Sequence, residues 1–430
     1  MSQPTLSPRP SLPHPTPGLS FWHRTTRAFP YLNSNSTAAV PPSSKYVVIG
    51  SGIAGALTTF SLIKEQGIPA NDILILEARE AVSGPSGKNA GHVRPDAFRG
   101  FSMYATVHGP EQALKIIENE KLVFERVAAF VKNNDVPCDF HHTTTFDVCL
   151  TPEFAALELK SFQEYEKAGG DLSHVRFYEG DKAKTKTGVQ STVAAYEWPA
   201  GSIHPAKLAQ WLLSSVIEKG ARLWTHCPAT SIARSSPTSG WDIHTPRGSI
   251  AAEQVIHCTN AYASYLLPQL QESITPNIAQ AHSIIPSAGL AGENALHNTY
   301  SLRYSLHHFY SLIQRQGDGT LVLGASRTNP KLSQKTRDSL VDFDDSGCQE
   351  EIVEDALHTF NALFPESARL GQKRQGEGLD QAWTGIIAKS VDLVPWVGEL
   401  DGFEGQWVCA GFNGHGEFLL ILTTIICLIY

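Results

Sequence analysis

The sequence has few cysteines, no Cys-x-x-Cys pair, no block of basic residues and no apolar run as long as a membrane span. Its seven cysteines are an odd number and lie far apart, which argues against a disulfide framework and against a structural zinc site. With 34 Lys and Arg against 42 Asp and Glu, the formal net charge is -8, so no nucleic-acid partner is expected. We therefore expect a globular protein without a metal site.

The two ends of the chain differ in character. Residues 1–44 are rich in Pro, Ser and Thr and lack the features of a secretory signal, so we expect an extended arm and a cytoplasmic location. Aromatic residues at 21–23 and 29–31 predict that this arm docks on the domain that follows. Residues 418–430 are almost entirely apolar, but a span needs about 20 such residues, so no membrane span is expected.

A strand, a glycine-rich turn, a helix and a second strand follow one another near the start of the chain. The β-branched run 45–49 leads into Gly50-Ser51-Gly52-Ile53-Ala54-Gly55, and a helix-forming stretch covers 56–65. A buried strand is expected at 73–76, and Glu77 follows it directly. This order is typical of a dinucleotide fold, in which the helix start faces a pyrophosphate and the acid accepts hydrogen bonds from a ribose. The unit alone does not separate NAD from FAD.

The segment after Glu77 contains a second loop of small residues. A P-loop would need Gly at 82 and Ser or Thr at 89, where the chain has Val82 and Asn89, and the Gly-x-Ser-x-Gly hydrolase elbow is absent here. Instead, Ser86-Gly87-Lys88-Asn89-Ala90-Gly91 suits a cofactor that continues beyond its pyrophosphate and is wrapped closely. Flavin is such a cofactor.

This segment resembles the Ser-Gly-Arg-Asn-Gly-Gly stretch of the D-amino-acid oxidase type of FAD-dependent oxidoreductases. That family includes glycine oxidase, sarcosine oxidase and the γ-glutamylputrescine oxidoreductases, and the last branch is nearest in appearance. Lys88 stands where the family usually has Arg, and Ala90 where it has Gly. The resemblance runs from about residue 20 to residue 416. Further matching segments are 196–205, 221–230, 255–261, 383–398 and 410–416.

The resemblance implies that non-covalent FAD is bound, because the place of the sarcosine-oxidase cysteine, near Gln381, holds no Cys. It also implies that the loop around Gly414 begins a helix aimed at the flavin pyrimidine. The residues expected to bind the cofactor are Gly50, Gly52, Ile53, Ala54, Gly55, Glu77, Ala78, Ser86, Gly87, Lys88, Asn89, Gly91, Ala229, Gly385, Gly414, His415 and Gly416.

The expected fold is α/β with an α+β cap: a Rossmann-like FAD-binding domain with an inserted antiparallel-sheet substrate domain. The FAD-binding domain is assigned to 45–100, 171–269 and 376–430. The substrate domain is assigned to 101–170 and 270–375, because 111–134 has the apolar stripe of a packed helix and Gly317-Asp318-Gly319 marks a hairpin.

The substrate side is less defined by sequence. Glycine and D-amino-acid oxidases carry a carboxylate-binding Arg two residues after the Gly that matches Gly385, and here that position is Ile387. An amine without an adjacent carboxylate is therefore the better expectation. Candidate substrate-facing residues are His92, Arg303 and Arg327, and no catalytic side chain is assigned. His307 and His308 lie in the same alternating stretch as Arg303.

The resulting hypothesis is an FAD-dependent oxidoreductase that oxidises the C–N bond of an amine or amino-acid-like substrate by hydride transfer, with molecular oxygen as a possible acceptor. One alternative is a C-terminally truncated relative with weak FAD binding and little activity, because Glu417 and the apolar residues after it differ from the family's helix. A further alternative is an NAD-dependent dehydrogenase, but it would give the segments 86–91 and 411–416 no role. A non-enzymatic binding module is the last alternative.

Overall fold

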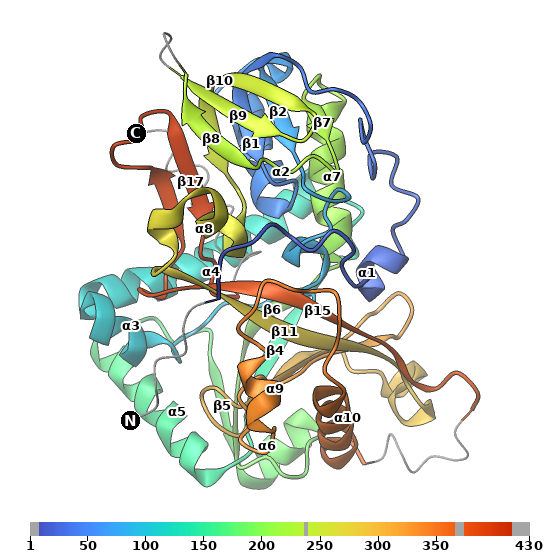
Figure 1. Cartoon of the computed structure of the whole chain (residues 1–430). Coiled ribbons are helices and arrows are strands. Elements are labelled where there is room, and N and C mark those ends of the chain that lie inside the picture. Colours follow the sequence, from blue (N-terminus) through green and yellow to red (C-terminus); the bar gives the residue numbers. More distant parts are fainter. Residues whose placement is uncertain (1–7, 236–239, 366–373, 415–430) are drawn as a thin grey trace.

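Two sheets form the two halves of the molecule in a computed structural model, which describes residues 8–235, 240–365 and 374–414 (Figure 1). The first sheet has the order β16-β17-β10-β1-β2-β7, and β8 and β9 join it through β10. Its strands are β1 (Ser43–Ile49), β2 (Ile73–Leu76), β7 (Arg222–Trp224), β8 (Ser231–Arg234), β9 (Trp241–Thr245), β10 (Gly248–His257), β16 (Trp396–Glu399) and β17 (Gln406–Ala410).

The centre of this sheet is parallel and buried on both faces. β1 pairs in parallel with β2 and β10, and β10 pairs in parallel with β17. Val48 and Ile75 belong to the same core as helices α2 (Ile53–Lys64) and α7 (Pro205–Ile217), whereas Val47 and Leu74 pack with residues of β9 and β10. Because alternate side chains point to opposite faces, a strand segment buried on both faces must be apolar throughout, as β2 and the last three residues of β1 are.

The second sheet has nine strands in the order β15-β11-β14-β13-β12-β4-β6-β3, and β5 pairs with β6. Most neighbours are antiparallel, but β4 and β12 are parallel. Its strands are β3 (His92–Val93), β4 (His141–Cys149), β5 (Arg176–Glu179), β6 (Ala194–Ser202), β11 (Ile274–Ile285), β12 (Thr299–Arg303), β13 (Phe309–Gln314), β14 (Leu321–Gly324) and β15 (Gly378–Ser390).

Strand membership differs from the expected division of the chain at three places. β3, the β5–β6 pair and β15 fall in ranges that the sequence assigns to the FAD-binding domain, yet they hydrogen-bond within the nine-stranded sheet. The motifs at these places mark the ends of strands near the cofactor loops. These motifs do not indicate which strand each segment will pair with. The pairing determines the sheet to which a strand belongs.

Helices cover the outer faces of both halves (Figure 1). The predicted helix at 111–134 is confirmed as α4, and the hairpin around Gly317-Asp318-Gly319 is confirmed as β13–β14. Within the described ranges, no helix combines the length and apolar character needed to cross a bilayer. The remaining helices are α1 (Phe21–Arg24), α3 (Phe101–His108), α4 (Pro110–Asn133), α5 (Pro152–Lys167), α6 (Gly180–Thr187), α8 (Ala263–Leu266), α9 (Gln334–Asp338) and α10 (Glu350–Leu363).

The N-terminal arm docks on the following domain, as its aromatic residues predict. Phe21 and Trp22 are buried in α1, within the same core as α2 and α7. Ser20 caps this short helix by accepting a hydrogen bond from the His23 amide. The arm therefore packs as part of the first half of the molecule.

Candidate functional site

A cavity of about 440 Å³ lies where the two sheets face each other. One wall comes from the carboxyl ends of β1 and β2 and from the loop at 84–90, and the other comes from β11, β12, β14 and β15. Such a position, outside the carboxyl ends of parallel strands, is where ligands bind in open α/β sheets. The expected cofactor residues that line it are Gly50, Gly52, Ile53, Ala54, Glu77, Ala78, Ser86, Lys88, Asn89, Ala229, Gly385 and Gly414.

Three of the other five expected cofactor residues do not line the described cavity. Gly55 lies in the first turn of α2, where an added Cβ would stand 1.9 Å from the Gly50 carbonyl oxygen, so it allows close helix–strand contact. Gly87 and Gly91 pack away from the cavity wall. His415 and Gly416 lie outside the described residues, as do 417–430.

The amino end of α2 is built to receive an anionic group. Its N-cap is Gly52, which has no side chain to cap the helix, and Ile53 donates its N–H to Ser86 Oγ at 2.8 Å. The N–H groups of the first helical turn have no partner within a helix, so that of Ala54, which lines the cavity, remains for a ligand. Unpartnered amides and the helix dipole together suit a phosphate. The residues present therefore fit the pyrophosphate of a dinucleotide.

Glu77 links the two small-residue loops while it lines the cavity. Its Oε2 accepts hydrogen bonds from the Ser51 amide at 3.0 Å and the Ser51 hydroxyl at 2.6 Å, and its Oε1 accepts from the Arg79 amide at 2.9 Å. A carboxylate has about four acceptor positions, so these three donors leave one for a ribose hydroxyl. The expected role of Glu77 in ribose binding is compatible with this geometry.

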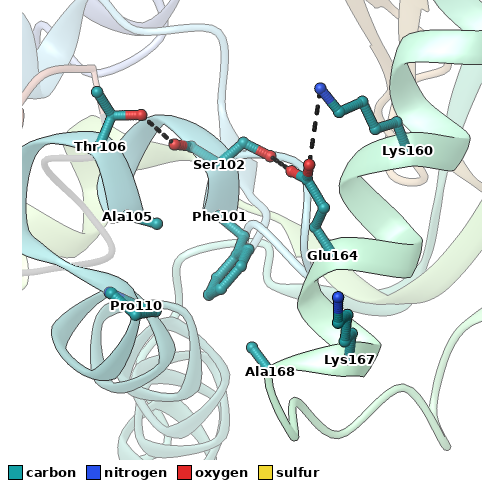
Figure 2. A pocket seen from close by; sticks show the side chains of 9 residues that line it. All are labelled: Phe101, Ser102, Ala105, Thr106, Pro110, Lys160, Glu164, Lys167 and Ala168. Atoms are coloured by element: carbon teal, nitrogen blue, oxygen red, sulfur yellow. Dashed lines mark hydrogen bonds and ion pairs between the residues drawn. The ribbon is translucent and has the colours of Figure 1, made fainter.

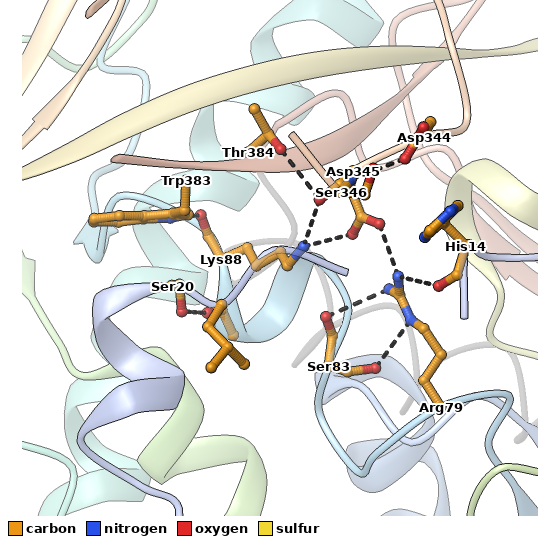
Figure 3. A network of polar contacts seen from close by, with 12 residues as sticks. His14, Ser20, Arg79, Ser83, Lys88, Asp344, Asp345, Ser346, Trp383 and Thr384 are labelled. Carbon is orange, nitrogen blue, oxygen red and sulfur yellow. Dashed lines mark hydrogen bonds and ion pairs between the residues drawn. The ribbon is translucent and has the colours of Figure 1, made fainter. Parts of the chain in front are cut away.

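Lys88 belongs to a buried ion triad that sequence reasoning missed (Figure 3). Its Nζ lies 2.7 Å from Asp345 Oδ2, and Arg79 Nη1 lies 2.8 Å from Asp345 Oδ1. All three side chains are at most 3% exposed. Burial lowers the pKa of Lys88 to about 8, although Asp345 opposes this shift. Burial would also lower the pKa of Arg79, but Asp345 raises it above its usual value.

The N-terminal arm packs against the outer side of the second small-residue loop, at 86–91. The sequence predicts that the arm docks but does not predict these contacts. Trp22 Nε1 donates to the Asn89 carbonyl at 2.7 Å, and Ser20 Oγ donates to the Gly87 carbonyl. A Cβ at Gly87 would lie 2.1 Å from His23 Nε2, so only glycine leaves room for the arm there. The arm also reaches the cavity, whose lining includes residues 11–13.

We predict that Trp22→Phe speeds release of the bound cofactor several-fold. Phenylalanine keeps the buried ring but removes the indole donor to Asn89, and one such hydrogen bond contributes about 0.5–1.5 kcal/mol. The measurement is the rate at which flavin fluorescence appears after dilution of the holoprotein. Trp224→Phe removes a similar bond, from Trp224 Nε1 to the Ala39 carbonyl, away from the loop. An equal effect of both variants would contradict a specific role of the arm.

His92, Arg303 and Arg327 all line the cavity, so the structure brings the three candidate substrate residues together. Both ring nitrogens of His92 are buried without a hydrogen-bond partner in the described residues. Burial lowers the pKa of His92 to about 3, so the ring is neutral at physiological pH. His307 and His308 are not part of the lining, because β12 ends at Arg303 and the chain turns there.

Arg303 belongs to a second cluster that the sequence does not predict. It shares Asp147 of β4 with Arg94 and Arg99: Arg303 Nε lies 2.8 Å from Asp147 Oδ1, and Arg94 Nη2 lies 2.9 Å from Oδ2. Arg99 Nη1 also contacts Oδ2. Three guanidinium groups around one carboxylate make this part of the wall strongly positive. The pKa of Asp147 is held far below its usual range, because these three cations outweigh the effect of its burial.

A separate hollow of about 520 Å³ lies between α3 and α5 (Figure 2). Its polar groups contact one another: Ser102 Oγ donates to Glu164, and Lys160 lies 3.6 Å from the same carboxylate. None of the expected site residues lines it. Because Lys160 and Glu164 pair with each other and are exposed, this hollow provides fewer free, buried polar groups for a ligand than the cavity between the sheets does.

Comparisons with known proteins agree with the geometry. The family model described as "FAD dependent oxidoreductase" (DAO) matches residues 45–422. Gamma-glutamylputrescine oxidoreductase of Escherichia coli is 23% identical over 388 residues, which are 86% of this chain and 79% of that protein. Human mitochondrial dimethylglycine dehydrogenase is 24% identical over 378 residues, 86% of this chain but 40% of that protein.

Solved structures show the same fold at low sequence identity. Glycine oxidase from Geobacillus kaustophilus has a TM-score of 0.68 at 19% identity and covers 90% of this chain and 94% of its own. L-amino acid deaminase from Proteus vulgaris has a TM-score of 0.66 at 17% identity, with 92% and 91% covered. The expected mixed α/β architecture is thereby confirmed.

Proposed function

The chain belongs to the DAO family of FAD-dependent oxidoreductases, and from this premise we propose that it oxidises the C–N bond of a small amine or amino acid in the cavity between the sheets. FAD is its cofactor, and it is an enzyme that acts on CH–NH donors, as the matched family and its relatives are. The truncated-relative alternative is not favoured, since the family match extends to residue 422.

The observation that carries the proposal is the composition of one cavity. The α2 amino end, Glu77 and the loop at 84–90 lie on one wall, and His92, Arg303 and Arg327 line the same space. Flavin held by the first group would supply a hydride acceptor for the carbon next to the substrate nitrogen, and the residues of the two groups would hold cofactor and substrate together. We assign cofactor positioning to the first group of residues and substrate contact to the second.

His92 is the residue best suited to contact the substrate nitrogen. Its neutral ring offers one acceptor nitrogen and one donor, and neither is used by a described protein group. Accepting a hydrogen bond from the amine would orient the nitrogen lone pair. Because only the deprotonated amine can give up the hydride, we expect the rate of flavin reduction to rise with pH through the pKa of the bound amine.

The test begins with an absorption spectrum of the purified protein, before and after acid precipitation. Flavin bands that pass into the supernatant are expected, which would show non-covalent FAD. Anaerobic mixing with a panel of amines and amino acids should then bleach the flavin, and a peroxide assay in air would report whether oxygen is the acceptor. A protein that stays colourless with added FAD, or a flavin that no member of the panel reduces, would overturn the proposal.

A variant at the start of α2 checks that the flavin absorption comes from cofactor bound in this cavity. In Gly52→Val the new Cβ would stand 2.9 Å from Ser86 Oγ and the added methyl groups would fill the turn at the start of α2. This variant should lack flavin bands while the wild type has them. Flavin retained unchanged in Gly52→Val would mean that the cofactor binds elsewhere.

A further inference from the structure

The N-terminal arm, dark blue in Figure 1, runs between the two halves of the molecule before it reaches α1. It is bonded to both halves. The His14 carbonyl accepts a hydrogen bond from Arg79 Nη1 at 3.3 Å, just after β2 of the eight-stranded sheet (Figure 3). The Leu19 carbonyl accepts one from Gln381 Nε2, in β15 of the nine-stranded sheet. From residue 14 onward, the arm is therefore fixed on both sides of the cavity.

The part of the arm before His14 differs, because it lies against the cavity without polar partners. Residues 11–13 line the cavity, and Leu12 and Pro13 are half-buried there. No hydrogen bond joins residues 8–13 to any other part of the chain that the structure describes. This segment, the strap, can therefore move away from the cavity without breaking a hydrogen bond.

The composition of the arm makes the strap stiff. Five of the ten residues from 8 to 17 are proline. Proline fixes φ and has no N–H, so such a run favours an extended polyproline course and offers the rest of the protein few donors. The chain bends at residues 15 and 16, where the Thr16 amide donates to His14 Nδ1 at 3.3 Å. A stiff segment beyond a bend moves as one unit, so this bend is a hinge for the strap.

The strap begins on the cofactor side of the cavity. Its first anchor, His14, bonds to Arg79, which is two residues after Glu77, and both Arg79 and Glu77 line the cavity. The candidate substrate residues His92 and Arg303 belong to β3 and β12, in the opposite wall. Because the anchor lies beside the acid expected to meet a ribose, the strap is placed to cover cofactor.

We propose that the strap is part of the cofactor site: Leu12 and Pro13 close over bound FAD, and the strap swings away before FAD leaves. Apolar side chains suit this task, because they exclude water from the ligand that they cover. The role is distinct from that of Trp22, which holds the loop at 86–91 from its outer side. It also goes beyond the proposed reaction, since it concerns how the cofactor is retained, whatever the substrate.

The first test compares flavin release from two leucine variants of the full chain. Leu12→Ser removes apolar cover from the strap, whereas Leu19→Ser makes the same change at an arm residue that is 44% exposed and does not line the cavity. We expect Leu12→Ser to release flavin about fivefold faster than wild type, which corresponds to about 1 kcal/mol of lost apolar contact. Leu19→Ser should release it at the wild-type rate. The measurement is the appearance of flavin fluorescence after dilution of the holoprotein.

The second test asks whether bound FAD holds the strap in place. Ser11→Cys puts a thiol on the strap, and its alkylation by iodoacetamide is followed by peptide mass with and without saturating FAD. We expect FAD to slow alkylation at residue 11 several-fold. Thr16→Cys, at an exposed position outside the cavity lining, should react equally fast in both states.

Three results would overturn the proposal. The first is flavin release that is unchanged in Leu12→Ser or equally fast in Leu19→Ser, and the second is alkylation at residue 11 that FAD does not slow. The third is a raised KM for an amine substrate in Leu12→Ser with unchanged flavin release, which would assign the strap to the substrate entrance. Release and alkylation need no substrate, so they decide the role of the strap even where no amine reduces the flavin and the proposed function fails.

Discussion

Replacing Asp147 with Asn is expected to lower the free energy of unfolding by about 3–5 kcal/mol, the usual cost of removing one partner from a buried ion pair. Asp147 is fully buried, and its carboxylate is shared by Arg94, Arg99 and Arg303. An amide leaves three guanidinium groups close together, and within the described part of the chain only Arg99 keeps an ion pair with a second carboxylate, Asp96, at 3.4 Å. The measurement is the shift of the urea midpoint, followed by tryptophan fluorescence on holoprotein.

Glu158→Gln is the matched control for this variant, because it makes the same chemical change beside the same arginines. Both carboxyl oxygens of Glu158 are buried and have no hydrogen-bond partner among the residues that the structure describes. Burial, assisted by the charge of Asp147, raises the pKa of Glu158 well above its usual value and so favours its neutral form. Gln resembles that neutral form in size and charge, and we expect the urea midpoint to stay or rise. A large loss in both variants would show that any carboxyl-to-amide change here is disruptive.

The same cluster predicts a pH dependence of stability. The folded pKa of Asp147 lies below its unfolded value of about 3.9, so its stabilisation is complete above that pH and is lost as the pH falls below about 4. Asp147→Asn should therefore flatten the acid side of the stability profile. A variant whose stability falls as steeply as that of wild type below pH 4 would contradict this role.

The second large effect is expected at Asp345. Asp345→Asn leaves Lys88 and Arg79 buried without their shared carboxylate, which again costs about 3–5 kcal/mol. Because Lys88 lines the cavity, we also expect weaker retention of FAD. The thermal midpoint and the flavin content after gel filtration measure the two effects.

The neighbouring Asp344 supplies the control for Asp345. Asp344 is exposed and accepts a hydrogen bond from the Ser346 amide, which Asn can also accept. Asp344→Asn should therefore leave both the midpoint and the flavin content close to wild type. An Asp345→Asn protein with normal stability and normal flavin content would show that the triad (Figure 3) is not what fixes the second loop.

The sequence by itself determined the βαβ unit and the loop after it. Gly50, Gly52 and Gly55, the apolar strands and Glu77 are neighbours in the chain, and each is required by local geometry at a fixed spacing. The burial of the arm's aromatic residues could likewise be predicted from the sequence, because Phe21 and Trp22 are too apolar for a free tail. Such features can be predicted because the constraint and the residues that satisfy it lie in the same short segment.

Only the tertiary structure decided how the charges are paired and where the wall of the cavity is positive. Asp345 meets Lys88 across 257 residues and Arg79 across 266, and Asp147 meets Arg303 across 156. Arg327 likewise contacts Asn277 of β11 across 50 residues. No local sequence pattern encodes these long-range contacts, because they depend on which strands pair and on how the two sheets face each other.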